Sequence, residues 1–517
     1  MAQFIDAEKA AELFHDGMSV GICGFGGWLG ADIIFHAIAR RYERTGRPRN
    51  LSVFSGILPG DLTTGSRGMN ILAMDGLISE VRAAHVGMAL SFGKMIAENR
   101  MRAFALPLGL VTDLLHAAAS GKPAVISPVG LGSFCDPRVE GGALNNLAAR
   151  SGGKVAELTE LDGKEYLLYR TPTLDACIMR IGTADSDGNL SARDDPMTAE
   201  QLEMALAVKA CGGIVIAQVD RLAEGKLSPR DILLHNSLVD FIVLDLDGQC
   251  TPGYDCPAFR PELCGYAIKE TDAFKPMPLN NRKICGRRAV LELQRGNVVN
   301  LGIGIPEAVA AVAAEEGIFS QLLLSVESGP LGGVPVSGPG FGAAVNPQVI
   351  YRLEDNFNFY DGGGLDMSFL GAGEIDEQGN VNVSRFGKRT TGPGGFINIV
   401  QSSPVVCFMS TFTASGLETE VVDGKLRICS EGKSRKFRKR VEQITFSSWQ
   451  ARKKRQKVMY ITERAVFTLG DAGLVLTEIA PGVNLEKDIL ACMDFRPEIS
   501  PELREMDKRI FQAGKML

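Results

Sequence analysis

Glu327 is the residue of this chain whose setting best suits covalent chemistry. It follows the largely apolar residues 322–326 and is itself followed by Ser328, Gly329 and Pro330. An apolar strand that ends in a Gly/Pro turn presents its next side chain at the C-terminal edge of an open α/β sheet, where ligands bind. A carboxylate placed there can serve as a nucleophile, a general base or a helix cap. The segment taken alone favours the last of these, a capping or exposed turn acid.

The positions of the histidines and glycines do not fit a serine hydrolase built around Ser328. All five histidines lie in the first half of the chain, the last at His235. A catalytic Ser328 would therefore need a base from the other half. The Gly-x-Ser-x-Gly turn of serine hydrolases also fails, because Val326 and Pro330 stand where glycines are needed.

The glycine-rich turns do not complete a dinucleotide-binding pattern. Gly302 and Gly304 are followed by Pro306 and Glu307, so the third glycine of Gly-x-Gly-x-x-Gly is missing. What remains is a carboxylate among glycines. A glutamate can attack an activated acyl group such as a thioester, in a two-step covalent route with ping-pong kinetics. Backbone N–H groups of glycines can stabilise the developing oxyanion. Residues 392–395 and 329–333 are candidate sources, and a plain tight turn is the alternative for each.

The elements around these turns occur twice. A helix over residues 7–15 leads into a strand over 18–23, and a helix over 287–293 leads into a strand over 297–301. Each half then has a second strand that ends in a Ser-Gly turn. In the first half, Phe54 occupies the position that Glu327 occupies in the second half. The pattern predicts two related halves, of which only one carries the carboxylate. Chance similarity of two α/β units is the alternative.

The size of the chain predicts more than one domain. A chain of 517 residues and 55.5 kDa exceeds what a single hydrophobic core usually organises. Strand-like and helix-like segments alternate, which predicts an α/β fold with mainly parallel sheets. Residues 271–281 read as an irregular linker. We therefore predict an N-terminal domain over 1–275 and a C-terminal domain over 282–517.

Composition excludes several classes of protein. The net charge of −6 gives no basic stripe for nucleic acid. The sequence contains no apolar stretch of 18 residues, so we expect no membrane span, and no secretory signal is visible. Eleven scattered cysteines fit reduced thiols in the cytoplasm, and the spacing of Cys250, Cys256 and Cys264 matches no zinc site. Basic runs over 433–440 and 452–457 are typical of solvated faces, although one of them could meet a nucleotide phosphate.

Several motifs in a consistent order make the chain resemble the family I coenzyme A transferases, in their long fused form that includes propionate and acetate CoA-transferases. The likeness begins near residue 7 and runs to the C-terminus. The motifs that carry it are residues 135–138, 299–306, 325–329, 359–366, 392–398, 460–467 and 478–482.

The resemblance implies two open α/β/α domains with the active site between them, and a homodimer or homotetramer. It implies that Glu327 is the nucleophile that forms a glutamyl-CoA thioester. Coenzyme A is then a substrate, and neither a metal nor another cofactor is needed. Contacts to the oxyanion or substrate are expected from the glycines of three turns, and contacts to coenzyme A from a fourth. The contacts to the oxyanion or substrate are expected from Gly394, Gly395, Gly329 and Gly26. The contacts to coenzyme A are expected from Gly302 and Gly304.

The sequence departs from this family at two places. Relatives usually carry glutamine where Leu108 follows Pro107, so an amide that could contact the substrate is missing and a more apolar acyl chain, or reduced activity, is expected. Residues 356–359 are a lesser departure. We predict a CoA-transferase acting on short-chain acids of the acetate, propionate and butyrate class. An acyl-CoA hydrolase using the same glutamate and a non-catalytic ligand-binding protein on this fold are the alternatives.

Overall fold

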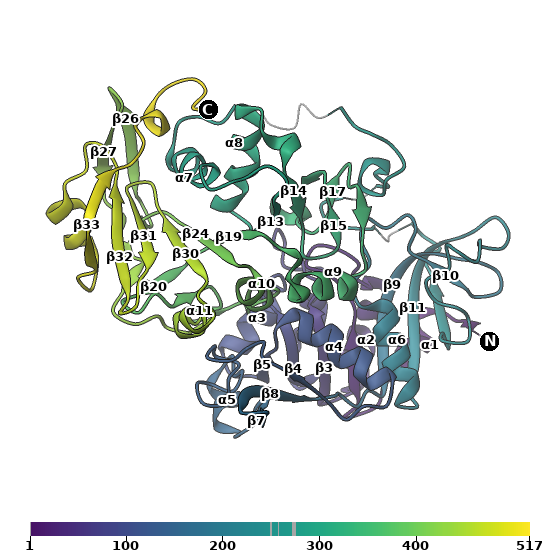
Figure 1. The fold of residues 1–517 in the computed structure, drawn as a ribbon. Helices are drawn as coiled ribbons and strands as arrows, with labels where there is room; N and C mark the ends of the chain where they lie inside the picture. The colour runs from purple at the N-terminus through teal and green to yellow at the C-terminus, as the bar shows by residue number, and fades with distance from the viewer. Residues whose placement is uncertain (1, 249–250, 257, 271–275) are drawn as a thin grey trace. The chain divides into compact units, whose positions relative to one another are not determined.

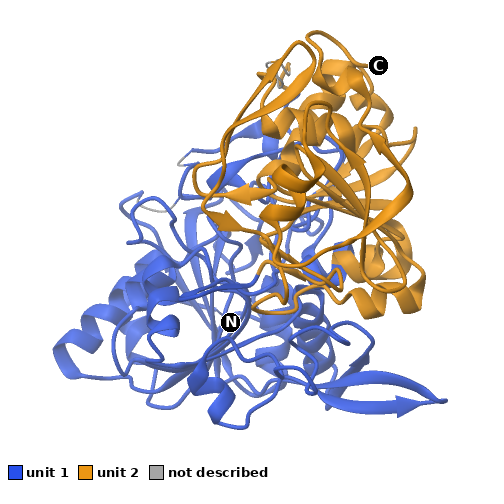
Figure 2. Ribbon diagram, turned by 90° about the vertical axis from the view of Figure 1, so that its left-hand side faces the viewer, with its two compact units in different colours: residues 1–268, 326–358, 384–398 blue, residues 269–325, 359–383, 399–517 orange. Residues whose placement is uncertain are grey.

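A computed structural model describes residues 2–248, 251–256, 258–270 and 276–517. The first part of the predicted linker, residues 271–275, lies outside the described residues. The chain forms two compact units (Figure 2). Unit 1 comprises residues 1–268, 326–358 and 384–398, and unit 2 comprises residues 269–325, 359–383 and 399–517. The chain thus enters unit 1 again just before Glu327.

Unit 1 is built on a mainly parallel sheet in the strand order β1-β12-β11-β9-β2-β3-β4-β5, with β10 antiparallel to β9 (Figure 1). Its central strand β9 is buried along its whole length, as expected of a parallel strand covered on both faces. The strands are β1 (Gln3–Phe4), β2 (Ser19–Ile22), β3 (Leu51–Ile57), β4 (Ile78–His85), β5 (Arg102–Ala105), β9 (Ala176–Ala184), β10 (Leu190–Ser191), β11 (Ile214–Leu222) and β12 (Phe241–Leu244).

The helices of unit 1 follow the turns that the sequence marks. The side chain of Asp6 caps the first helix by accepting a hydrogen bond from the Lys9 N–H at 2.7 Å, and Gly46 ends the second helix with a φ of 67°. The helices are α1 (Ala7–Glu12), α2 (Asp32–Thr45), α3 (Leu90–Ala97), α4 (Leu108–Ala119), α5 (Asn146–Arg150), α6 (Gln201–Ala210) and α9 (Leu353–Phe359), whose last residue belongs to unit 2. Helices α4 and α6 pack against each other and on the strands of the sheet (Figure 1).

Unit 2 repeats this plan with a sheet in the order β14-β13-β19-β24-β30-β31-β32-β33. Strands β14 to β30 in that order are parallel, and β31 is antiparallel to both of its neighbours. The strands are β13 (Val298–Leu301), β14 (Leu323–Ser325), β19 (Met367–Gly371), β24 (Val405–Met409), β30 (Lys457–Ile461), β31 (Ala465–Leu469), β32 (Leu474–Ile479) and β33 (Glu498–Glu505). The helices are α7 (Asn281–Val290), α8 (Ala308–Glu316), α10 (Phe396–Ser402), which begins in unit 1, and α11 (Ser448–Lys454).

Short strands complete the two units. Three of them form a separate antiparallel sheet in unit 1: β6 (Ala124–Ser127), β7 (Glu157–Leu161) and β8 (Lys164–Arg170). The others are β15 (Pro330–Leu331), β16 (Val334–Pro335), β17 (Ala344–Val345), β18 (Val349–Ile350), β20 (Glu374–Asp376), β21 (Val381–Asn382), β22 (Arg385–Phe386), β23 (Arg389–Thr390), β25 (Thr413–Ala414), β26 (Glu418–Val422), β27 (Lys425–Ser430), β28 (Ser434–Arg435) and β29 (Phe437–Arg438).

The backbone pairing supports the predicted repeat but corrects its alignment. Strand β2 lies between β3 and β9, and β13 lies between β14 and β19. Ser52 and Leu323 occupy matching positions, because the N–H of each donates at 2.9 Å to the residue just before the neighbouring strand. Four residues further along each strand direction are Gly56 and Glu327. The predicted match of Phe54 with Glu327 is therefore wrong by two residues.

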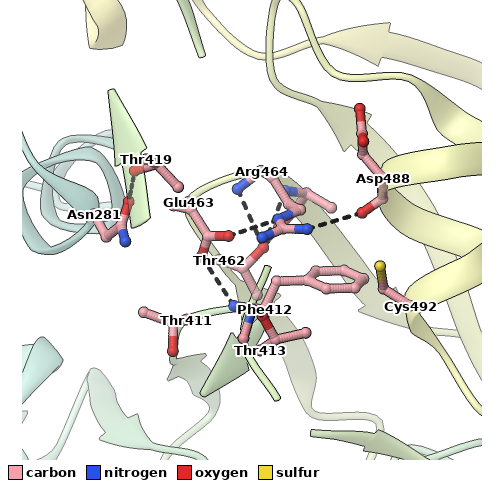
Figure 3. Close-up of polar contacts among 12 residues, drawn as sticks. Asn281, Thr411, Phe412, Thr413, Thr419, Thr462, Glu463, Arg464, Asp488 and Cys492 are labelled. Carbon is pink, nitrogen blue, oxygen red and sulfur yellow. Dashed lines mark hydrogen bonds and ion pairs between the residues drawn. The ribbon is translucent and has the colours of Figure 1, made fainter. Parts of the chain in front are cut away.

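A buried ion network explains one motif of unit 2 (Figure 3). Glu463 and Arg464 are fully buried and pair with each other at 2.7 Å. Arg464 also donates to the carboxylate of Glu431 at 2.7 and 3.2 Å and to the backbone carbonyl of Asp488 at 3.0 Å. The second oxygen of Glu463 accepts the N–H of Phe412 at 2.9 Å. These two motif residues therefore hold unit 2 together.

None of the helices in the described ranges is long and apolar enough to cross a membrane.

Candidate active site

Glu327 lies two residues beyond the end of strand β14, in a turn that is held by two backbone hydrogen bonds. The N–H of Val326 donates to the carbonyl of Pro330 at 2.9 Å, and the N–H of Gly329 donates to the carbonyl of Val326 at 3.0 Å. Gly329 has a φ of 129°, and a Cβ on it would lie 2.0 Å from the carbonyl oxygen of Tyr351. Only glycine fits there, and its N–H is used by the turn itself.

The carboxylate of Glu327 faces the glycine loop that the sequence singled out. The N–H of Gly395 donates to Oε2 of Glu327 at 3.1 Å. A Cβ on Gly395 would lie 2.1 Å from that oxygen and 2.8 Å from the ring of Phe357, so the close approach requires glycine. Glu327 is half-buried and forms no ion pair with the described residues.

Burial sets the protonation of this carboxylate. Loss of hydration raises the pKa of Glu327 to about 7, and the hydrogen bond from Gly395 acts in the opposite direction. The group therefore changes charge near neutral pH. Perturbed carboxylates of this kind are typical of catalytic sites, although buried structural carboxylates also show such shifts.

The loop that carries Gly395 is fixed to two elements of unit 1. The N–H of Gly394 donates to the carbonyl of Ala84 at 3.0 Å, at the end of β4. The carbonyl of Gly394 accepts the N–H of Leu108, at the start of α4, at 3.0 Å. Both polar backbone groups of Gly394 are thus engaged, and Gly395 is the glycine whose N–H points at Glu327.

A residue to which the sequence analysis assigned no role holds the backbone of Glu327. Asn356 on α9 is completely buried, and its Nδ2 donates to the carbonyls of Val326 at 3.1 Å and Glu327 at 2.9 Å. Residues 356–359 were noted only as a departure from the family. The local sequence holds no signal for this contact, because the partners lie about thirty residues apart, at separations of 30 and 29.

A second carboxylate lies beneath the start of α4. Oε1 of Glu200 accepts the N–H of Gly56 at 3.0 Å, while Oε2 is buried without a hydrogen-bond partner among the described residues. A Cβ on Gly56 would lie 3.0 Å from Leu108 Cδ1 and 3.1 Å from Glu200 Oε1, so both side chains lie over Gly56. Burial raises the pKa of Glu200 to about 7.

Glu203, on α6, belongs to a polar cluster with α9. It accepts a hydrogen bond from Arg352 at 3.0 Å, and His116 lies 3.3 Å from Glu354. Burial, and then the hydrogen bond with Glu354, raises the pKa of Glu203 to about 8.

The remaining predicted glycines are distributed over both units. Gly26 lies in unit 1 with a φ of 59°, and its carbonyl accepts the N–H of Gly60 at 2.8 Å. Gly302 and Gly304 belong to unit 2, where the N–H of Gly302 donates to Phe369 at 2.8 Å and Gly304 has a φ of 88° with open space at its Cβ position. Substrate or coenzyme contacts by these three glycines stay predictions.

Both basic runs make many contacts within unit 2. Arg435 and Arg438 pair with Asp494 at 3.0 and 3.1 Å, and Lys457 pairs with Glu292 at 2.8 Å. Lys453 lies over the ring of Trp449, 5.3 Å from its centroid. Of the three cysteines considered for a metal, Cys250 lies outside the described residues, Cys256 is buried and Cys264 is half-buried.

Comparison with known proteins identifies the family. The sequence model of the family described as Coenzyme A transferase matches residues 4–245. The chain is 41% identical to a caffeate CoA-transferase from Acetobacterium woodii, over 99% of this chain and 98% of that protein. It is 40% identical to the acetate CoA-transferase YdiF of Escherichia coli strain K12, over 99% of this chain and 96% of that protein.

The fold agrees with this likeness in sequence. A crystal structure of the acyl-CoA transferase YdiF from Escherichia coli O157:H7, described as a thioester complex with CoA, matches with a TM-score of 0.91 and 38% identity. The match covers 100% of this chain and 97% of that one. With near-complete coverage in both sequence and structure, the chain belongs to the coenzyme A transferases of family I, in their fused form, and is a CoA-transferase.

Proposed function

We propose that this enzyme moves coenzyme A between short-chain carboxylic acids of the acetate, propionate and butyrate class through a thioester formed on Glu327. The hydrogen bond from Gly395 to Oε2 of Glu327 is the observation that carries the proposal. In support, one close relative is named for acetate and another for caffeate, and the solved relative is described as a thioester with CoA.

The reaction begins with attack of the Glu327 carboxylate on the carbonyl carbon of an acyl-CoA. The C–S bond breaks, coenzyme A leaves as a thiolate, and an acyl-glutamyl anhydride remains. The thiolate then attacks the glutamyl carbonyl and expels the donor acid as a carboxylate, which leaves Glu327 as a thioester of coenzyme A. An acceptor carboxylate reverses these steps and departs as the new acyl-CoA, so the kinetics are ping-pong.

Gly395 has a specific part in this sequence. Once the glutamyl carbonyl is attacked, its oxygen carries developing negative charge at the place where Oε2 now accepts the Gly395 N–H. A donor already aimed at that position lowers the barrier without reorganisation. The step needs only a carboxylate, this N–H and a thioester, so coenzyme A enters as a substrate and the proposal includes no metal or other cofactor.

Leu108 bears on the acyl group. Its backbone N–H donates to the carbonyl of Gly394, next to the residue that contacts Glu327. Its side chain is buried and apolar, whereas the resemblance described above implies an amide at this position. We therefore propose a preference for acyl chains without polar substituents. A homodimer or homotetramer located in the cytoplasm also stays part of the proposal.

Intact-mass spectrometry tests the intermediate directly. The protein is incubated with acetyl-CoA without an acceptor acid and then reduced with borohydride, which converts a glutamyl thioester to an alcohol. We expect a change in the mass of the intact protein, which digestion then locates on the peptide that carries Glu327, and no change in Glu327→Gln. Acetate, propionate, butyrate and caffeate, offered as acceptors, then rank the substrates by kcat/KM.

Three outcomes distinguish the candidate functions. Modification of Glu327 with transfer to an added acid supports the CoA-transferase mechanism. Continuous thiol release from acetyl-CoA without an acceptor acid supports the hydrolase. Absence of an adduct across the acids and thioesters tested, with Glu327→Gln behaving like the wild type, would remove Glu327 from the chemistry.

A further inference from the structure

His85 is a titratable side chain beside the glycine loop that the mechanism above does not use. It is the last residue of β4, and it lies opposite Ile57 of β3 in the register of the sheet. These two strands are parallel, so their C-terminal ends meet at the edge of the sheet where open α/β folds bind ligands. The topology therefore presents the imidazole at the ligand-binding edge of unit 1.

Two hydrogen bonds place His85 close to Glu327. The carbonyl of Ala84 accepts the N–H of Gly394 at 3.0 Å, and the N–H of Gly395 donates to Oε2 of Glu327 at 3.1 Å. Since Gly394 and Gly395 are consecutive, the Ala84 carbonyl oxygen lies within roughly 10 Å of that carboxylate oxygen. His85 is the next residue after Ala84. A substrate whose reacting atom is at Glu327 can therefore reach the imidazole with its neighbouring groups.

The ring of His85 lies over a glycine and beside the loop. A Cβ on Gly87 would lie 2.9 Å from Cε1 of His85 and 2.8 Å from Cγ2 of Thr391, so both side chains lie over Gly87. The N–H of Val86 donates to the carbonyl of Thr391 at 2.8 Å, which fixes the backbone that follows His85. His85 itself is half-buried. The residue is thus held in place while part of its surface stays accessible.

Neither ring nitrogen of His85 has a hydrogen-bond partner among the residues that the structure describes, and Nδ1 is buried. A buried polar atom costs folding free energy unless it is hydrogen-bonded, so native proteins keep few such atoms and each one calls for an explanation. A bound molecule that offers hydrogen-bonding groups at this position provides one.

The surroundings of His85 decide which groups it can bind. Burial, and then the nearby charge of Arg389, lowers the pKa of His85 to about 4, so the ring is neutral near pH 7. A neutral imidazole has one N–H donor and one acceptor nitrogen. A carboxylate offers acceptors only, whereas an amide offers both a carbonyl oxygen and an N–H. The ring is therefore matched to an amide and not to the carboxylate of an acid substrate.

The pantetheine arm of coenzyme A has the required groups. Two amides follow its sulfur, each after a short two-carbon spacer. We propose that the imidazole of His85 hydrogen-bonds an amide of this arm while the thioester carbon lies at Glu327. The inference rests on the proposed function, because it takes an acyl-CoA as the substrate at Glu327. It makes His85 a substrate-binding residue that takes no part in making or breaking bonds.

Thioesters that differ only in the arm test this contact. S-acetylpantetheine has both amides, S-acetyl-N-acetylcysteamine keeps the one nearest the sulfur, and S-ethyl thioacetate has neither. We expect His85→Leu to lower the ratio of kcat/KM for S-acetylpantetheine to that for S-ethyl thioacetate by about three- to tenfold, because one hydrogen bond between neutral groups is lost. A general disturbance of the glycine loop would lower both values alike and leave the ratio unchanged. S-acetyl-N-acetylcysteamine then shows which amide is bound.

Two further variants serve as controls. His85→Gln keeps a donor and an acceptor on a side chain of similar size, so it should recover part of the ratio. His235→Leu makes the leucine substitution at an exposed histidine of unit 1, whose Nδ1 lies 3.0 Å from Ser237 Oγ. It should leave the ratio as in the wild type.

The melting temperature separates substrate binding from a structural role. Leucine removes a buried nitrogen that has no partner in the described residues, so we expect His85→Leu to unfold at the temperature of the wild type or above it. A fall in melting temperature with an unchanged ratio would show that His85 serves the fold, for instance by holding a buried water, and would overturn the inference.

The inference and the proposed function can fail separately. If the wild type transfers coenzyme A and His85→Leu keeps the ratio, His85 does not bind the arm and the inference falls alone. If the wild type shows no transfer from any thioester, the proposed function fails. Nuclear magnetic resonance of protein with isotope-labelled histidine then still decides, because the chain has five histidines and the signal of His85 is the one missing in His85→Leu. A shift of that signal on adding pantetheine supports the contact, and no shift excludes it.

Discussion

The charge state of one carboxylate governs the proposed chemistry at the residue scale. Burial raises the pKa of Glu327 to about 7, and only the ionised form can attack a thioester. We therefore expect kcat/KM to rise with pH through about 7 and to level off above it. The measurement is kcat/KM for acetyl-CoA between about pH 5.5 and pH 8.5. A flat profile over that range would show that Glu327 is already fully ionised.

The same shift predicts the opposite trend for stability. A carboxylate whose folded pKa is raised contributes stability below its unfolded pKa, and this contribution is lost as pH rises through the folded value. Glu327 and Glu200 titrate near 7 and Glu203 near 8. The unfolding free energy should therefore fall from about pH 5 to about pH 8, and Glu327→Gln should reduce that fall.

Gly395 offers a second test at the residue scale. Alanine there would place its Cβ 2.1 Å from Glu327 Oε2, so the carboxylate must move. A displacement of about 1 Å from a productive geometry can cost about 100-fold in rate, and we expect at least that loss in kcat for Gly395→Ala. Gly362→Ala is the control, because Gly362 has open space at its Cβ position and no positive φ. Normal kcat in Gly395→Ala would contradict the oxyanion role.

One helix end and one helix face assemble the site at the scale of elements. The first residue of α4 binds the carbonyl of Gly394, and α9 supplies Asn356 to the backbone of Glu327. Neither contact adds a charged group. Each instead fixes a backbone segment, so that the Gly395 N–H and the carboxylate meet at hydrogen-bond distance.

The start of α4 carries a prediction about substrate choice. Leu108→Gln conserves volume and places an amide over Gly56, where the Leu108 side chain now lies. We expect kcat/KM for 3-hydroxybutyrate relative to butyrate to rise by about three- to tenfold, the worth of one hydrogen bond. Leu108→Met, which stays apolar, should leave this ratio unchanged. Equal ratios in the two variants would show that residue 108 does not set acyl preference.

At the scale of the whole molecule, the chain leaves and re-enters each compact unit. Glu327, Asn356 and Gly395 come from two later segments that complete unit 1, while strand β14, which leads to Glu327, belongs to unit 2. The predicted domain ranges of 1–275 and 282–517 divide the sequence at one boundary, whereas each compact unit is made of three separate segments of the sequence. Those ranges stay a prediction about evolutionary domains.

The buried network of unit 2 is a matter of stability. Arg464→Met keeps the volume but leaves Glu463 buried without its cation, although Phe412 still donates to it. We expect the unfolding free energy to fall by about 3–5 kcal/mol, measured by urea denaturation at fixed pH. The double variant Glu463→Gln/Arg464→Met should recover part of the loss. Full stability in Arg464→Met would contradict this role.

The sequence by itself determined the fold class and the family, and it singled out Glu327 as the proposed nucleophile. Strand and turn patterns are local, and Glu327 is recognisable because an apolar strand delivers a single acid into a glycine turn. The glycine loop at 392–395 was found on the same basis. Its chemistry was predictable because glycine is the residue type that lets a backbone approach a reacting group closely.

Only the tertiary structure decided which groups meet. It aimed the N–H of Gly395, not that of Gly394, at the carboxylate, and it aligned Gly56, not Phe54, with Glu327. It also brought Asn356 to the backbone of Glu327 and raised the pKa of Glu327 through burial. Hydrogen-bond direction, register and desolvation depend on partners far apart in the chain, and no local pattern encodes them.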